Sequence, residues 1–94
     1  MSEHTVVVQK WEESELGWGT RPDGFSLHLN EEARSAYVRE YWKKMPEYPP
    51  EEYSRPYGTP YFTTVSEETY REIEVKGGSL RRYHGPTPSG WMPV

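Results

Sequence analysis

Residues 21–32 read RPDGFSLHLNEE, and residues 55–68 read RPYGTPYFTTVSEE. Each stretch has an Arg-Pro-x-Gly turn, then a strand-like run, then a helix-capping residue followed by two glutamates. The chain therefore uses the unit of turn, strand and capped helix twice. True duplication and independent recurrence of common turn and cap chemistry explain this likeness equally well.

Proline and glycine have a geometric role in each turn. Proline fixes φ at the second position of a type I turn, and glycine accepts the left-handed conformation that follows. Residues 21–24 are therefore predicted to form a hairpin turn with a bulge. Apolar and polar residues alternate in 25–29, which predicts a strand with one buried face. Asn30 is expected to cap a helix from Glu31 to Lys44, which Pro46 stops.

The second unit predicts similar elements. Residues 61–65 favour a strand, and Ser66 is expected to cap a short helix that ends near the two glycines at 77–78. Residues 79–83 are predicted to form a last strand at an edge of the sheet, where the charges of Arg81 and Arg82 are tolerated.

The N-terminal part supplies the strongest strand signal. Val6, Val7 and Val8 are consecutive β-branched residues, which is typical of a central strand covered on both faces. The short segment around Trp18 is counted as another strand. The order β-β-β-α-β-α-β predicts an α+β fold with a mainly antiparallel sheet of four to five strands and two helices on one face. Residues 1–83 are predicted to form one domain, and 84–94 a tail rich in proline and glycine.

Residues 46–60 have an unusual composition, with five prolines and three tyrosines. Proline suppresses helices and central strands, so this segment is predicted to be an irregular loop with polyproline II stretches. Long loops in small domains are often functional, and the tyrosines argue against plain disorder.

Composition limits the class of protein. Of the 94 residues, 33% are hydrophobic, and four Trp and eight Tyr make up for scarce aliphatics. The absence of cysteine excludes disulfides, cysteine-based metal sites and thiol nucleophiles. No stretch reaches the roughly 20 apolar residues of a membrane span, and the N-terminus is too polar for a signal peptide. These features predict a cytoplasmic protein.

The charge is negative overall and unevenly placed. The net charge of −4 argues against general nucleic-acid binding. All 15 acidic residues precede Lys76, whereas residues 76–94 hold three basic residues and no acid. This basic segment is expected either to pack against the acidic body or to bind an anion or a partner.

The sequence predicts neither catalysis nor a bound metal or cofactor. His4, His28 and His84 lack the spacing of a helical metal site, and His28 is expected to be a surface or hydrogen-bonded residue. The glutamate pairs at 31–32 and 67–68 are explained as charges at helix N-termini. No phosphate-binding glycine loop is present. We therefore expect a protein that is not an enzyme.

Arginine and aromatic residues are the candidate binding residues. Arg21 and Arg55 precede the two turns, and Arg81, Arg82 and Tyr83 form a basic and aromatic cluster. Further rings that are not all expected to be buried are Trp18, Tyr53, Tyr57 and Trp91. Such residues are enriched at protein–protein hot spots. The alternative is structural: the arginines pair with nearby glutamates, and the rings form the core.

Two binding functions follow from this set. The first is a small accessory or inhibitor protein that docks on a larger protein partner, through residues 46–60 and 79–92, and modulates or blocks it. The second is a binder of a nucleotide or another anion, with Arg55, Tyr57, Arg81, Arg82 and Tyr83 lining the site.

In size, acidity and aromatic content the chain resembles the small accessory proteins of phages and mobile elements. Self-association is a further expectation, since a homodimer would cover exposed rings and an edge strand.

Overall fold

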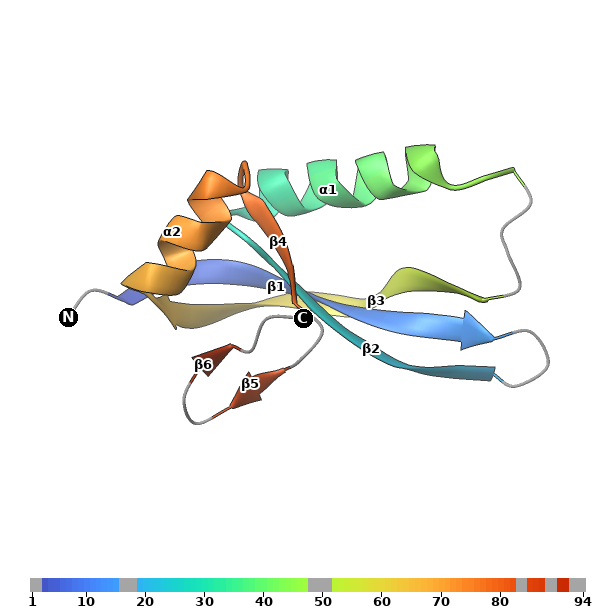
Figure 1. Ribbon diagram of the computed structural model, residues 1–94, viewed down its shortest axis with the longest axis horizontal. Coiled ribbons are helices and arrows are strands. Elements are labelled where there is room, and N and C mark those ends of the chain that lie inside the picture. Colours follow the sequence, from blue (N-terminus) through green and yellow to red (C-terminus); the bar gives the residue numbers. More distant parts are fainter. Residues whose placement is uncertain (1–2, 16–18, 48–51, 83–84, 88–89, 92–94) are drawn as a thin grey trace.

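The computed structural model describes residues 3–15, 19–47, 52–82, 85–87 and 90–91. A four-stranded antiparallel sheet and two helices confirm the predicted α+β class (Figure 1). The elements in chain order are β1 (Glu3–Glu15), β2 (Gly19–His28), α1 (Glu31–Lys44), β3 (Glu52–Ser66), α2 (Glu67–Val75), β4 (Ser79–Arg82), β5 (Pro86–Thr87) and β6 (Gly90–Trp91).

The strand order in the main sheet is β3-β1-β2-β4. β1 is therefore an interior strand, and Val6, Val7 and Val8 are all buried, as three consecutive valines predicted. β4 lies at one edge, which confirms the expectation for the last strand of the sheet. β3 lies at the other edge.

Both helices begin where their caps predicted. The Asn30 side chain accepts a 2.8 Å hydrogen bond from the Ala33 backbone N–H, and Ser66 Oγ accepts one of 3.3 Å from Thr69. Each cap satisfies a backbone donor that the first turn of a helix leaves without a partner. α1 runs from Glu31 to Lys44 as expected.

Neither Arg-Pro-x-Gly segment is a turn between strands, which corrects the prediction of a hairpin turn at residues 21–24. They lie inside β2 and β3, where Gly24 and Gly58 have φ of +81° and +72°. The register of β2 against β1 shifts between Lys10 and Glu12, and that of β3 shifts between Val8 and Lys10. The glycines therefore form β-bulges on both sides of the same part of β1.

Within the described residues, two strands precede α1. The segment around Trp18, predicted as a separate strand, lies outside the described residues. β1 and β2 are long strands that pair from Glu15 opposite Gly19 to Val7 opposite His28. The bulge at Gly24 lets β2 continue through a sequence that otherwise looks like a turn.

The predicted irregular loop is also corrected in part. β3 begins at Glu52 and contains Pro56 and Pro60. A proline cannot donate to a ladder, but it is tolerated in an edge strand whose other side is open. Residues 48–51 of the predicted loop lie outside the described residues.

The sheet is strongly twisted. In Figure 1 the strands at the right-hand end follow the order β3, β1, β2 from top to bottom, and at the left-hand end this order is reversed. The viewer therefore sees opposite faces of the sheet at its two ends. Bulges increase the local twist of a strand, and here they flank β1 on both sides.

This twist changes how the helices pack, and the prediction that both cover one face is wrong. Tyr37 of α1 contacts Trp11, whose side chain lies on the same face of the sheet as Val7. Ile73 of α2 clusters with Val6 and Val8 on the opposite face. Both helices lie on one side of the molecule only because the sheet has turned between them.

The opposite face holds the aliphatic core. Its buried members are Val6, Val8, Leu27, Val65 and Ile73, with Phe25, Leu29, Tyr70, Leu80 and Trp91 packed around them. The Trp91 ring stands edge-on to Phe25, with centroids 5.4 Å apart. Part of the predicted tail therefore packs onto the sheet, through the small β5–β6 hairpin. The domain boundary at residue 84 stays a prediction.

Replacing Gly58 tests the bulge in β3. A β-carbon there would have ordinary contact with Lys10 Cε, at 3.8 Å, so the cost is conformational rather than steric. We expect Gly58→Ala to lower the free energy of unfolding by about 1–2 kcal/mol, because an L-residue is strained at positive φ. Gly58→Asn should cost less, since asparagine tolerates this conformation. Urea denaturation would measure both, and equal costs would contradict the bulge geometry.

Candidate functional site

A chain of hydrogen bonds runs beneath α1 on its face of the sheet. Trp11 Nε1 donates to Ser26 Oγ at 2.7 Å, and Ser26 Oγ lies 2.8 Å from His28 Nε2. On the other side of the ring, His28 Nδ1 lies 2.7 Å from Ser79 Oγ, which donates to the Ala33 carbonyl at 3.3 Å. The chain thus joins β1, β2, β4 and α1.

The ends of this chain fix its direction. The indole of Trp11 can only donate, and the Ala33 carbonyl can only accept. Because the Ser79 hydroxyl donates to Ala33, it accepts from His28 Nδ1–H, and the Nε2 of a neutral ring then accepts from the Ser26 hydroxyl. Neutral His28 is therefore the Nδ1–H tautomer, and a second proton on Nε2 would deprive the Ser26 hydroxyl of this acceptor.

The surroundings of His28 also disfavour its charged form. The side chain is completely buried, where the sequence predicted a surface or hydrogen-bonded residue. Burial, followed by the positive charge of Arg34, lowers the pKa of His28 from 6.5 to about 4, although the Glu31 carboxylate acts in the opposite direction.

Ser26 Oγ and His28 Nε2 are as close together as a nucleophile and its base, but neither group is accessible to a substrate. Both residues are fully buried, and Ser26 Oγ already receives the hydrogen bond from Trp11. A substrate could reach the hydroxyl only if α1 moved away. The arrangement is that of a satisfied buried polar chain, which orients α1 on the sheet.

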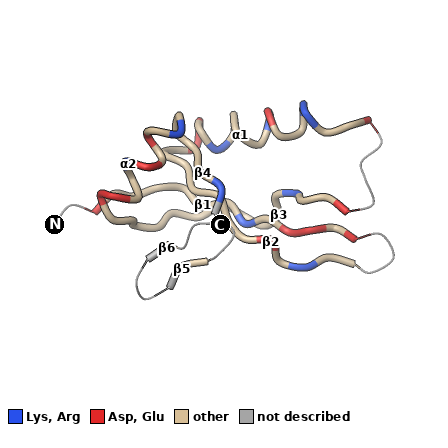
Figure 2. The backbone as a smooth tube through the Cα atoms, viewed as in Figure 1, with Lys and Arg blue, Asp and Glu red and all other residues tan. Residues whose placement is uncertain are grey.

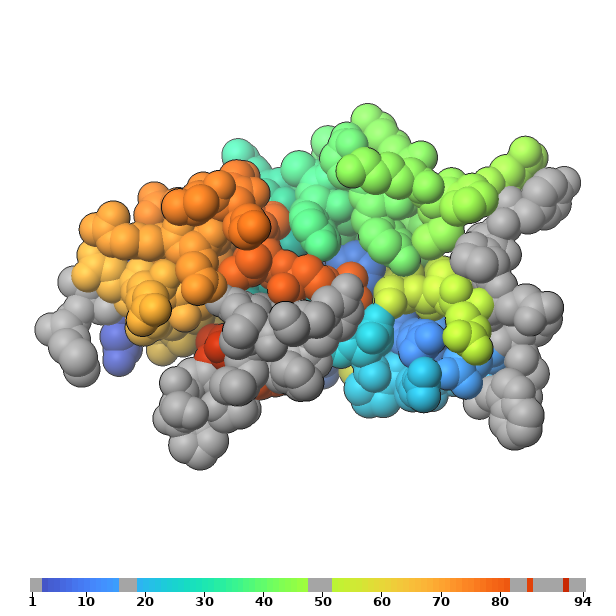
Figure 3. All heavy atoms as spheres, in the orientation of Figure 1, coloured from blue at the N-terminus to red at the C-terminus, as the bar shows by residue number. Residues whose placement is uncertain are grey.

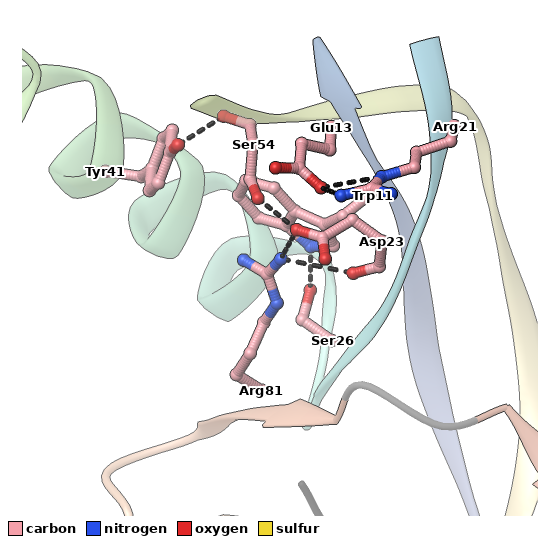
Figure 4. Close-up of polar contacts among 8 residues, drawn as sticks. All are labelled: Trp11, Glu13, Arg21, Asp23, Ser26, Tyr41, Ser54 and Arg81. Carbon is pink, nitrogen blue, oxygen red and sulfur yellow. Dashed lines mark hydrogen bonds and ion pairs between the residues drawn. The ribbon is translucent and has the colours of Figure 1, made fainter. Parts of the chain in front are cut away.

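Arg81 belongs to the same face, where it is part of a second polar cluster (Figure 4). Its guanidinium lies 4.3 Å from the centroid of the Trp11 ring and 3.0 Å from Asp23 Oδ2. Asp23 also accepts from the Ser54 hydroxyl, and the Ser54 carbonyl accepts from Tyr41 Oη. Burial raises the pKa of Tyr41, which keeps this hydroxyl protonated. Arg81 therefore links four strands and α1 rather than facing solvent.

Arg21 and Arg55 form ion pairs with the central strand. Arg21 stands directly opposite Glu13 and lies 2.8 Å from its carboxylate, and Arg55 stands opposite Glu12 at 2.7 Å. Hydrogen bonds to these glutamates raise the pKa of both arginines. Figure 2 shows this alternation, with acidic residues at the end of β1 and basic residues on the strands beside it. The arginines before the two bulges thus have a local structural role.

Three predicted site residues share one face of β3. The register of β3 against β1 is regular from Glu52 to Tyr57, so Tyr53, Arg55 and Tyr57 point to the same side of the sheet. Lys10, the direct partner of Tyr57, joins them with its Nζ 5.7 Å from the ring centroid. We call Lys10, Tyr53, Arg55 and Tyr57 the platform.

Lys10, Arg55 and Tyr57 lie on the face opposite α1. Tyr53 also lines a cavity with the end of α1, which lies next to the first half of β3 in Figure 3 (green and yellow-green). At this end of the three strands, the end of α1 is the nearest other described element in Figure 1, and it lies above the sheet. The platform side chains are half-buried against one another and the strands, and the Arg55 side chain is 39% exposed. Together with Glu12, the ion-pair partner of Arg55, they place aromatic and charged groups on one face of β1 and β3.

Among the other predicted residues that the structure describes, Arg21, Arg81 and Trp91 do not join the platform. Arg81 and Arg21 lie on the other face, and Trp91 packs against the core. Arg82 pairs with Phe25 through the backbone, and its side chain is outside the described set, as are Trp18 and Tyr83 entirely. A single site built from Arg55, Tyr57 and Arg81 is therefore not formed.

Two exposed rings are not among the predicted binding residues. Phe62 is 73% exposed and Tyr61 38% exposed, both in β3 beyond the bulge. The signal for them was an uncharged strand next to proline-rich sequence, which is typical of an edge. A shallow apolar cavity also lies between the end of α1 and β3, lined by Tyr41, Lys44, Met45, Pro46 and Tyr53.

Within the described ranges, no three histidine, aspartate or glutamate side chains gather in a way that could hold a metal ion. Neither described helix has the length and apolar content needed to cross a lipid bilayer. Neither protein-family models, nor curated proteins, nor solved structures show a significant match to this chain.

Proposed function

We propose that this protein acts without catalysis, by docking its platform on a larger protein partner that it modulates or blocks. The observation that carries the proposal is the alignment of Tyr53, Arg55 and Tyr57 on one face of β3. Tyrosine and arginine are the residues that contribute most often to protein–protein hot spots.

The platform is also preorganised. Arg55 is held by Glu12 at 2.7 Å, and the Lys10 ammonium lies near the Tyr57 ring. The backbone beneath these side chains belongs to a paired strand. Side chains that are ordered before binding lose less conformational entropy on association, which favours affinity.

The nucleotide alternative has less support. It requires Arg55 and Arg81 to act on one anion, but these arginines lie on opposite faces of the sheet. Each is also paired with a carboxylate, Glu12 and Asp23 respectively. An anion would have to displace these carboxylates before it could bind.

Affinity purification from source cells tests the platform. We expect the wild-type protein to recover a stoichiometric partner, and Arg55→Ala or Tyr57→Ala to reduce the binding constant for that purified partner at least about tenfold, the usual scale of a hot spot. Arg39→Ala and Trp42→Ala are matched controls, because they remove an exposed arginine and an exposed ring from α1.

Two results would count against this function. One is the absence of any stoichiometric partner, and the other is an equal loss of binding in the platform variants and the α1 controls. Stabilisation of the wild-type protein by millimolar nucleotide, lost in Arg55→Ala, would instead support the nucleotide alternative.

A further inference from the structure

The second half of β3 has no strand paired to its outer side within the described residues. β3 forms a ladder only with β1 there, although β6 lies near β3, so no described strand hydrogen-bonds to its outer backbone groups. Residues 61–65 contain no charge and no proline, and they carry the exposed rings of Tyr61 and Phe62. Proteins normally block such edges with charges or prolines, because an open apolar edge pairs with other chains. Here Pro56 and Pro60 protect only the first half of the strand.

We propose that a second copy of this chain closes this edge, by pairing its own β3 antiparallel to the first about a two-fold axis. The axis stands perpendicular to the sheet, which becomes continuous across the two copies. This inference rests on the outer edge of β3 and shares only Lys10 with the platform.

Symmetry and the ends of the segment select the register. Cross-strand pairs in an antiparallel ladder alternate between two types, and a two-fold axis must map each pair onto one of the same type. The axis therefore passes midway between the two copies of one residue, which stand directly opposite each other. Pairing is bounded by Pro60 on one side and by Ser66, the cap of α2, on the other. Thr63 is the centre that uses the whole segment.

This register gives complementary side-chain pairs. Tyr61 stands opposite Val65 of the second copy, and Phe62 opposite Thr64 of the second copy. Aromatic and β-branched pairs of this kind stabilise antiparallel sheets. The two Phe62 rings become diagonal neighbours about 7–8 Å apart at the backbone, within reach of each other. The most exposed ring of the sheet is thereby covered by its own symmetry mate.

Charge also favours a second copy. The first turn of α2 follows Ser66 directly and carries Glu67 and Glu68. In the Thr63 register this acidic turn lies beside the Gly58 segment of the other copy. There Lys10 is next to Gly58, with its Cε 3.8 Å from where a Gly58 β-carbon would stand. Acidic and basic groups therefore meet at both ends of the paired segment.

Pairing about an axis perpendicular to the sheet keeps corresponding faces on the same side. The two platforms are then related by the same two-fold axis, one at each end of the paired strands. This step rests on the proposed function, and it implies a partner that is itself two-fold symmetric or repetitive, since both platforms would bind it together.

Single cysteines test the register directly, because the chain has no cysteine of its own. Thr63→Cys places two thiols opposite each other, with β-carbons about 4.5–5.5 Å apart, whereas Thr64→Cys separates them along the diagonal. Under mild oxidation we expect Thr63→Cys to form disulfide-linked dimers at least about tenfold faster than Thr64→Cys. Equal rates, or faster linkage at position 64, would overturn the register.

Sedimentation tests the dimer itself. The wild-type protein should sediment as a dimer at micromolar concentration, and Phe62→Lys should raise the dissociation constant at least about tenfold by placing a charge on the edge. Val75→Lys is the control, since Val75 is 84% exposed on α2 and away from the edge. A monomer at high micromolar concentration would overturn the proposal and leave the edge to a strand of another protein. Growth beyond a dimer, or equal weakening by both variants, would overturn it as well.

Discussion

Replacing Trp11 by alanine is expected to lower the free energy of unfolding by about 4 kcal/mol, as the loss of a large ring from a packed core does. Trp11 is completely buried in the central strand, and its ring contacts Tyr37 and Tyr41 of α1. The substitution also removes the hydrogen bond to Ser26 and the ring beneath the Arg81 guanidinium. A loss of this size is a large fraction of the stability of a small domain.

Chemical denaturation would measure this loss, and two other variants separate its causes. Trp11→Phe keeps most of the ring but removes the indole donor, so it should cost about 1–2 kcal/mol. Trp42→Ala removes a tryptophan that is 42% exposed on α1, and a cost below about 1 kcal/mol is expected there. If Trp11→Ala were no more destabilising than Trp42→Ala, the packing of α1 on β1 would have to be different.

Lowering the pH from about 7.5 to about 5 is expected to reduce the free energy of unfolding by about 2 kcal/mol through His28 alone. The unfolded chain takes up a proton as the pH falls through 6.5, whereas the folded protein does so only near pH 4. The unfolded state thus binds more protons in this interval, and stability falls with pH. The full loss, reached below about pH 4, is about 3 kcal/mol.

The groups around His28 determine the design of this test. Arg34 and Glu31 of α1 act on the ring electrostatically, Tyr37 packs on it, and Ser26 and Ser79 hold its nitrogens. Urea denaturation of wild type and His28→Gln at both pH values isolates the contribution, since His4 and His84 are present in both proteins. NMR should show no titration of the His28 ring above about pH 5. A midpoint near 6.5 would contradict the buried neutral tautomer.

Local signals in the sequence were reliable where the local chemistry is complete by itself. Asn30 and Ser66 were identified as caps because a side-chain oxygen followed by two glutamates satisfies the first turn of a helix. The three valines at 6–8 identified the central strand because a strand that is apolar on both faces must be covered on both faces. These elements were correctly predicted without knowledge of their neighbours.

Local patterns predicted the wrong element where one residue type suits two different structures. Proline followed by glycine is typical of turns, yet Gly24 and Gly58 form bulges inside long strands. Pro56 and Pro60 suppress central strands but are accepted at an edge. Which use applies depends on the strand order, and nothing local to these residues encodes it.

The candidate site was likewise predictable from the sequence only in part. Composition predicts three binding residues in this segment, Tyr53, Arg55 and Tyr57. They are two residues apart, so they share one face once the segment is a strand. The separation of Arg55 from Arg81 was not foreseeable, because it depends on the face of the sheet to which each side chain points. The buried chain from Trp11 to Ser79 joins residues far apart in the sequence, so only the packing of α1 reveals it.

The sequence by itself determined the helices with their caps, the central strand and the α+β class, because hydrogen bonds and burial within a few residues decide them. The tertiary structure decided the strand order, the two bulges and the twist that lets α1 and α2 cover opposite faces from one side of the molecule. It also decided which arginines are neutralised by glutamates and which rings stay exposed. These properties arise from contacts between distant segments, and the free energy of such contacts depends on geometry that no local pattern contains.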